Sequence, residues 1–234
     1  MAGWYVKIRD FGECTEVNGI QYALNLYTLA ESVNASCVLE IGAGWGWSSR
    51  AFALSLENRL PARLVSVDTN PQRIHRKNRR AVLNTHVAWD ILDTESAKVD
   101  VDGEFDILYI DGDPYLAQAD FLRFYPKLSP GGLVIMDGYG GQVGPTEAVD
   151  GLLSSYPFVT LPYHLGYAHA VHRKPKPLLV KDGFSAACDE CGTVTPYRNW
   201  REVDTVARDH TNKFKHRVHV RVESRDLSYT VIPK

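Results

Sequence analysis

The sequence predicts an α/β fold in which a largely parallel sheet is covered by helices, followed by a small second domain. Strand and helix patterns alternate through residue 137, an order that is typical of right-handed βαβ units. The predicted strands are continuously apolar, as expected of strands that helices cover on both faces. A glycine-rich loop follows the first of them, at residues 42–46.

Composition and length agree with this class. The chain has 234 residues, enough for one α/β domain and an appendage. Its 26 Lys and Arg nearly balance 28 Asp and Glu, so no global basic field indicates nucleic acid. Four cysteines, only two of them close together, do not form a disulfide framework. We find no run of about eighteen apolar residues and no leader pattern, and expect a cytoplasmic protein without a membrane contact.

The first predicted elements surround the glycine loop. Apolar residues recur at close to the helical period over residues 19–33, which indicates an amphipathic helix. A strand at residues 38–41 then runs straight into the loop, where glycines allow positive φ and a close approach to a ligand. We expect Ser48 to cap the helix that follows.

The glycine spacing separates two classes of cofactor. A dinucleotide-binding loop has the pattern G-x-G-x-x-G, but Trp47 occupies the place of the third glycine. The observed pattern is E-x-G-x-G-x-G, with Glu40 two residues before the first glycine. It resembles motif I of the class I S-adenosylmethionine (SAM) methyltransferases. A glycine turn without a ligand is the alternative. The resemblance implies a set of cofactor-binding residues around this loop: Glu40, Gly42, Ala43, Gly44, Trp45 and Ser48.

Later strands also end in acidic residues. The strand at residues 64–68 ends in Asp68, about twenty residues after the glycines, where a carboxylate can accept both ribose hydroxyls. Residues 86–90 resemble the family's third strand, which implies that Asp90 contacts the adenine. The strand at residues 105–110 runs into Asp111, for which we expect both cofactor contact and a catalytic role.

Two sequence segments indicate which branch of the methyltransferase family the chain resembles. YIDGD, which contains Asp111 and Asp113, and LSPGGLVIMD, which ends in Asp137, resemble the O-methyltransferase branch of the catechol, caffeoyl-CoA and antibiotic-sugar enzymes. This implies a Rossmann-like seven-stranded methyltransferase sheet whose last strand is antiparallel. Residues 158–163 and 167–172 have the pattern of its closing hairpin.

These acidic residues are candidates for the catalytic step of methyl transfer. Transfer to a hydroxyl is an in-line displacement that also requires removal of a proton. In catechol-type relatives, acids at the positions of Asp111 and Asp137 bind a divalent ion, and a lysine three residues after the first acid is the base. Pro114 occupies that position here, so the lysine base is absent. Asp113 and His164 are the two alternatives for the general base. A Mg²⁺ ion at Asp111 and Asp137 is a further alternative, and so is a purely structural role for both acids.

The second domain carries a separate motif. We place a domain of residues 1–176 before a basic, proline-containing stretch, and a zinc module at residues 181–234 after it. Two cysteines close together and two histidines close together, with a longer gap between the pairs, are typical of a tetrahedral zinc site. We expect a helix over residues 199–214, and His219 is the rival fourth ligand. A redox C-x-x-C and plain surface thiols are the alternatives. The expected zinc ligands are Cys188, Cys191, His210 and His216.

Together these patterns predict a SAM-dependent methyltransferase that acts on a hydroxyl of a small molecule. Three other functions stay open: a nucleic-acid methyltransferase guided by the zinc module, a protein methyltransferase that docks its substrate there, and a SAM-binding scaffold without activity. Homodimer formation also stays open.

Overall fold

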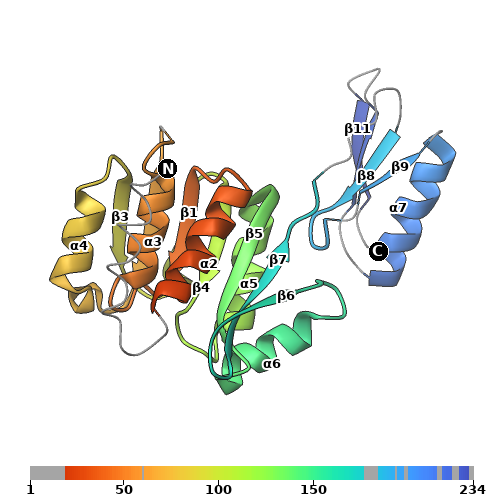
Figure 1. Ribbon diagram of the computed structural model, residues 1–234. Helices are drawn as coiled ribbons and strands as arrows, with labels where there is room; N and C mark the ends of the chain where they lie inside the picture. The colour runs from red at the N-terminus through yellow and green to blue at the C-terminus, as the bar shows by residue number, and fades with distance from the viewer. Residues whose placement is uncertain are drawn as a thin grey trace. The chain divides into compact units, whose positions relative to one another are not determined.

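A computed structural model describes residues 19–59, 61–176, 184–192, 194–197, 200–214, 218–222 and 227–231. The predicted zinc ligand His216 and the first eighteen residues lie outside these ranges. The chain divides between Arg173 and Lys174 into two compact units, each visible in Figure 1.

The first unit is built on a seven-stranded sheet with the order β3-β2-β1-β4-β5-β7-β6. Strands β1 to β5 run parallel, and β7 lies antiparallel to both β5 and β6. This confirms the expected seven-stranded mixed sheet with its reversed strand. The strands are β1 (Cys37–Ile41), β2 (Arg63–Asp68), β3 (Ala88–Asp93), β4 (Phe105–Ile110), β5 (Leu128–Tyr139), β6 (Val159–His164) and β7 (Tyr167–Arg173).

Helices cover both faces of this sheet (Figure 1). Side chains of neighbouring strand residues point to opposite faces, so Val38 of β1 packs in one core and Leu39 in the other. Phe52 of α3 belongs to the first core and Phe121 of α5 to the second. The α-helices are α2 (Gly19–Ser32), α3 (Trp47–Leu56), α4 (Arg76–Leu83), α5 (Ala117–Phe124) and α6 (Val143–Leu152). The short 3₁₀ turns are η2 (Pro71–Arg73), η3 (Ser96–Lys98) and η4 (Tyr125–Lys127).

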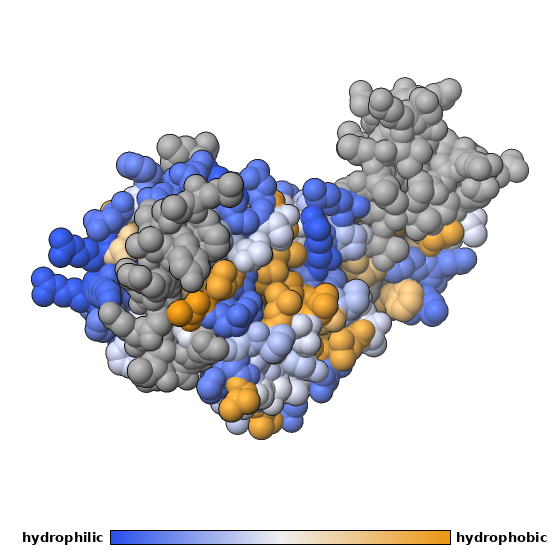
Figure 2. Space-filling view, viewed as in Figure 1, coloured by the Kyte–Doolittle hydropathy of each residue, from blue (hydrophilic) through white to orange (hydrophobic). Residues whose placement is uncertain are grey.

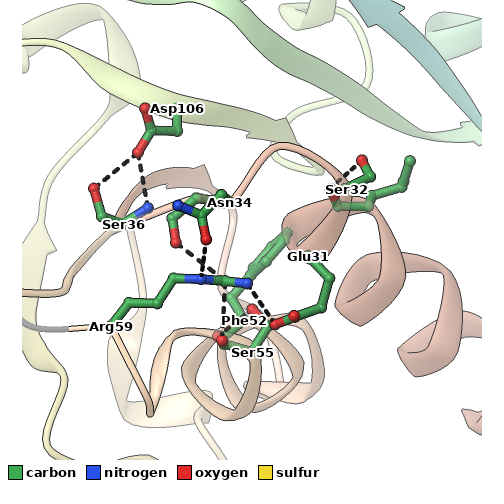
Figure 3. Close-up of polar contacts among 10 residues, drawn as sticks. Glu31, Ser32, Asn34, Ser36, Phe52, Ser55, Arg59 and Asp106 are labelled. Carbon is green, nitrogen blue, oxygen red and sulfur yellow. Dashed lines mark hydrogen bonds and ion pairs between the residues drawn. The ribbon is translucent and has the colours of Figure 1, made fainter.

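The turn between α2 and β1 is fixed by polar contacts to two side chains, Arg59 and Asp106 (Figure 3). The Arg59 guanidinium forms an ion pair with Glu31 at 2.8 Å and donates to the side chain of Asn34 at 3.0 Å. Asp106 of β4 accepts hydrogen bonds from the backbone amide of Ser36 at 2.8 Å and from its hydroxyl at 3.0 Å. These contacts fix the start of β1 beside β4, and therefore the place where the glycine loop leaves the sheet.

The second unit contains an antiparallel four-stranded sheet with the order β11-β10-β8-β9 and one helix. Its helix, α7 (Trp200–Phe214), covers the predicted range almost residue for residue. The strands are β8 (Phe184–Cys188), β9 (Val194–Tyr197), β10 (Val218–Val222) and β11 (Leu227–Val231). No described helix of either unit is long and apolar enough to cross a membrane.

Candidate active site

The glycine loop leaves the sheet between β1 and β4, where the strand order changes direction. Gly42 has a φ of +86°, and a Cβ atom built on it would lie 2.1 Å from the backbone oxygen of Asp111. Its amide donates to the carbonyl of Val67 at 2.8 Å, so the loop is held against both neighbouring strands. In open α/β sheets, ligands bind at such a switch point, outside the carboxyl ends of the strands.

Asp68 connects the end of β2 to this loop. Its Oδ2 accepts hydrogen bonds from the amides of Ala43 at 3.0 Å and Gly44 at 2.8 Å. Its Oδ1 accepts a bond from the Asn70 amide at 2.7 Å. The carboxylate therefore orients the loop and stands at the wall of a cavity.

The cavity has a volume of about 380 Å³ and opens at the carboxyl ends of β1, β2 and β4. Five predicted site residues line it: Gly42, Gly44, Asp68, Asp111 and Asp113. The sequence did not indicate the remaining polar lining, which comes from the turns after β2 and β3. These residues are Thr69, Arg73, Thr94, Glu95 and Ser96.

Asp90 does not reach this cavity. The predicted end of the third strand at residue 90 is wrong, because β3 continues to Asp93. Asp90 lies in the middle of the strand, opposite Val65 of β2, and its carboxylate pairs with Nε of Arg63 at 2.8 Å. Residues 94–96 stand where Asp90 was expected.

Glu40 and Ser48 are buried in the fold and are absent from the cavity wall. The Glu40 carboxylate accepts hydrogen bonds from the hydroxyls of Ser49 and Ser66, so it ties β1 to α3 and β2. Burial raises the pKa of this carboxyl group. The prediction that Ser48 caps α3 is wrong: Gly46 is the N-cap residue, with no side-chain bond, and Ser48 lies inside the helix.

Ala43 and Trp45 belong to the loop but are not part of the cavity wall either. Ala43 is buried and contributes its backbone to Asp68. The Trp45 side chain is 45% exposed, and the Arg73 guanidinium lies 5.4 Å from its ring centre. Trp45 is therefore connected to the cavity through Arg73, which lines it.

A buried polar network lies behind Asp111. Tyr109, two residues earlier on the same strand face, donates to Oδ2 of Asp111 at 3.2 Å. The Tyr109 hydroxyl also contacts the hydroxyl of Tyr22 at 2.5 Å. Asp111 itself is exposed to the cavity. Desolvation of its carboxyl group by the surrounding protein, followed by repulsion from Asp137, raises the pKa of Asp111 well above its ordinary value.

Asp137 faces a different set of partners. Its Oδ1 lies 3.1 Å from Nε2 of His169, although the two atoms are not aligned for a hydrogen bond. His169 is fully buried, and its ring centre lies 4.5 Å from that of Tyr163 and 5.1 Å from that of Tyr22. Burial and the nearby Asp137 carboxylate raise the pKa of Tyr163.

The two predicted alternatives for the base are placed differently. Asp113 lines the cavity, and its Oδ1 accepts a hydrogen bond from the Tyr115 amide at 2.9 Å. His164 is exposed at the hairpin turn between β6 and β7. The histidine beside Asp137 is His169, for which the sequence did not indicate a place in the site. Only the β5–β7 register, which pairs Met136 with Ala170, brings His169 close to Asp137.

Comparison with known proteins agrees with this geometry. Residues 39–139 match the family model Methyltransf_24, described as a methyltransferase domain. No curated protein matches the sequence. The matched residues lie within the first unit and run from β1 to the end of β5, so the match covers the strands that surround the cavity.

Solved structures of similar fold are also methyltransferases. The O-methyltransferase of Bacillus cereus in complex with SAH is 22% identical, with a TM-score of 0.52, over 65% of this chain and 79% of that one. The O-methyltransferase TomG of Streptomyces achromogenes, involved in tomaymycin synthesis and bound to SAM, is 17% identical, with a TM-score of 0.55, over 75% and 91%. The SAH-bound methyltransferase PaMTH1 of Podospora anserina is 17% identical, with a TM-score of 0.53, over 67% and 79%. At these identities the likeness establishes the fold.

Proposed function

We propose that this protein transfers a methyl group from SAM to a hydroxyl of a small molecule. The observation that carries the proposal is the cavity at the switch point, where Asp68 stands beside the glycine loop. Asp68 would accept the two ribose hydroxyls, and the amino-acid end of SAM would lie against Gly42 and Gly44. Residues 94–96, in place of Asp90, would border the adenine. The SAM- and SAH-bound O-methyltransferases of the same fold support this assignment.

The acid at the carboxyl end of β4 would serve the transfer step. The acceptor oxygen attacks the methyl carbon, the carbon–sulfur bond breaks, and its electron pair neutralises the sulfonium. The acceptor proton passes to a carboxylate. Asp111 suits this role because it lines the cavity and has a raised pKa, which makes its carboxylate a stronger base than an ordinary aspartate. Tyr109 holds one of its oxygens and thereby fixes the orientation of the group.

A magnesium-dependent step is the alternative for the same residues. Asp111 and Asp137 would be its ligands, and the ion would lower the pKa of a bound hydroxyl. Two features favour the route without a metal. Gly138 follows Asp137 where catechol-type relatives have an asparagine. Within the part of the chain that the structure describes, no third His, Cys, Asp or Glu side chain joins these two acids in a ligand cluster.

A nucleic-acid acceptor has less support. The basic residues of α4 are mostly exposed, and Figure 2 shows hydrophilic surface on that side of the first unit. Of the basic residues between positions 73 and 80, only Arg73, in the turn before α4, is part of the cavity lining. A solvated helix face accounts for the others.

The test is a transfer assay with methyl-labelled SAM and four acceptor pools: small-molecule phenols, catechols and sugars, then RNA, DNA and protein. The proposal predicts label in a small-molecule pool, retained after exhaustive chelation and lost in Asp111→Asn. Label confined to a macromolecular pool would refute the acceptor class. Activity that is lost on chelation and restored by Mg²⁺ would refute the metal-free step.

A further inference from the structure

A second site lies in the unit that follows Arg173. Three side chains from separate elements converge there: Cys188 at the end of β8, Cys191 in the next turn and His210 on α7. Their ligand atoms all lie within 4.8 Å of one another, and Sγ of Cys191 is 3.3 Å from Nε2 of His210. Cys188 is buried and the other two are partly buried.

The turn that carries the two cysteines is fixed by its own backbone contacts. The Gly192 amide donates to the carbonyl of Cys188 at 2.9 Å and closes the turn. Gly192 has a φ of +62°, a left-handed conformation that favours glycine. The Cys191 amide points at Sγ of Cys188, 3.4 Å away. An amide hydrogen directed at sulfur stabilises a metal-bound thiolate, because it disperses the negative charge.

We propose that this cluster binds one zinc ion, which joins strand β8 to helix α7. Two thiolates and an imidazole are a donor set typical of structural zinc. With Zn–S of about 2.3 Å and Zn–N of about 2.0 Å, tetrahedral ligand atoms lie about 3.5–3.8 Å apart. The separations observed here need only small side-chain rotations to reach that spacing.

The small size of the unit, residues 174–234, gives the metal a structural purpose. Among its described side chains, only Cys188, Ala207, Thr211 and Val218 are buried. A domain of this size seldom buries enough apolar surface to fold alone, and a metal cross-link is the usual compensation. Zinc binding to this site would contribute directly to folding of the unit.

The fourth ligand remains the sequence prediction, His216, which lies outside the described residues. His216 follows His210 by six residues, a spacing close to that of Cys2His2 sites. The rival, His219, is already engaged: its Nε2 lies 2.8 Å from Oδ2 of Asp189, and the side chain is half exposed. A redox role for the C-x-x-C pair fits less well, because Asp189 and Glu190 between the cysteines disfavour a reactive thiolate.

The test uses the full chain, expressed with zinc, dialysed and measured by elemental analysis. We expect one zinc per chain in the wild type and almost none in a Cys188→Ser, Cys191→Ser double variant. His219→Ala is the matched control and should retain the metal. Zinc content in the double variant equal to that of the wild type would overturn the proposal, as would a wild-type chain without zinc.

A second measurement does not depend on whether the variants fold. Cobalt added to the metal-free wild-type chain should give the charge-transfer absorption of thiolate-bound Co²⁺, and stoichiometric zinc should abolish it. Absence of that band would overturn the proposal. Retention of zinc in His216→Ala together with its loss in His219→Ala would refute the assignment of the fourth ligand. SAM affinity reports separately on the first unit, so failure of the zinc site and failure of the methyltransferase proposal are distinguishable.

Discussion

Gly42→Ala is the sharpest perturbation of the cofactor loop. The added methyl carbon would lie 2.1 Å from the oxygen, and 2.5 Å from the carbonyl carbon, of Asp111. Both are backbone atoms, so no side-chain rotation can relieve the clash, and the loop must move away from β4. Gly44→Ala is the matched control: φ is +49° there, and nothing lies within 4 Å of the added carbon.

The expected magnitudes follow from these two environments. Gly44→Ala adds only the left-handed strain of an L-residue, about 1–2 kcal/mol. Gly42→Ala adds overpacking of about 1–3 kcal/mol to a similar strain, for a total of about 2–5 kcal/mol. That is a large fraction of the roughly 5–15 kcal/mol by which a typical domain is stable.

Urea unfolding and calorimetric titration with SAH measure both consequences. Gly42→Ala should unfold at lower urea than Gly44→Ala, and it should bind SAH more weakly because the loop has moved. Equal losses of stability and affinity in the two variants would refute the close approach of Gly42 to Asp111 as the reason for this glycine.

Four further predictions concern the polar groups in and behind the cavity. Asp137→Asn removes the neighbouring charge that helps to raise the pKa of Asp111, so the acid limb of the pH–rate profile should move to lower pH; an unmoved limb would contradict the base assignment. Because a raised folded pKa makes stability fall as pH rises towards it, Asp111→Asn should unfold at higher urea than the wild type at pH 8, and the difference should shrink at acidic pH. His169→Ala removes the contact with Asp137 and should lower kcat with SAM affinity unchanged, whereas His164→Ala should change neither quantity. Equal kcat values in the two variants would show that His169 has no part in the transfer step. Glu40→Ala leaves two buried hydroxyls without their acceptor and should cost about 1–3 kcal/mol for each, measured by urea unfolding, and a loss below 1 kcal/mol would show that water replaces the carboxylate.

The sequence predicted the sheet because local patterns carry most of that information. Apolar runs gave the strands, the glycines gave the loop, and Asp68 and Asp111 stood directly at strand ends. The position of each of these residues follows from the strand that precedes it and does not depend on how the strands pair. The helix of the second unit could also be predicted, because its periodic apolar face extends over most of residues 199–214.

Features that depend on register or on exact element ends could not be predicted. Asp90 was misplaced because β3 runs three residues further than its apolar core suggests. His169 could not be placed beside Asp137 because nothing in its own segment indicates how β7 pairs with β5. Glu40 satisfies the motif by spacing, but its side chain points into the fold, where two serines bind it.

The central claim is that SAM binds in the cavity beside Asp68, and calorimetric titration of SAM into the wild type, Asp68→Ala and Asp90→Ala tests it most directly. Asp90→Ala is the control because its side chain pairs with Arg63, away from the cavity. We predict one SAM per wild-type chain, unchanged affinity in Asp90→Ala, and a loss of about 1.5–3 kcal/mol in Asp68→Ala, the range for hydrogen bonds to a charged group. Absence of SAM binding to the wild type, or equal affinity in all three chains, would contradict the account.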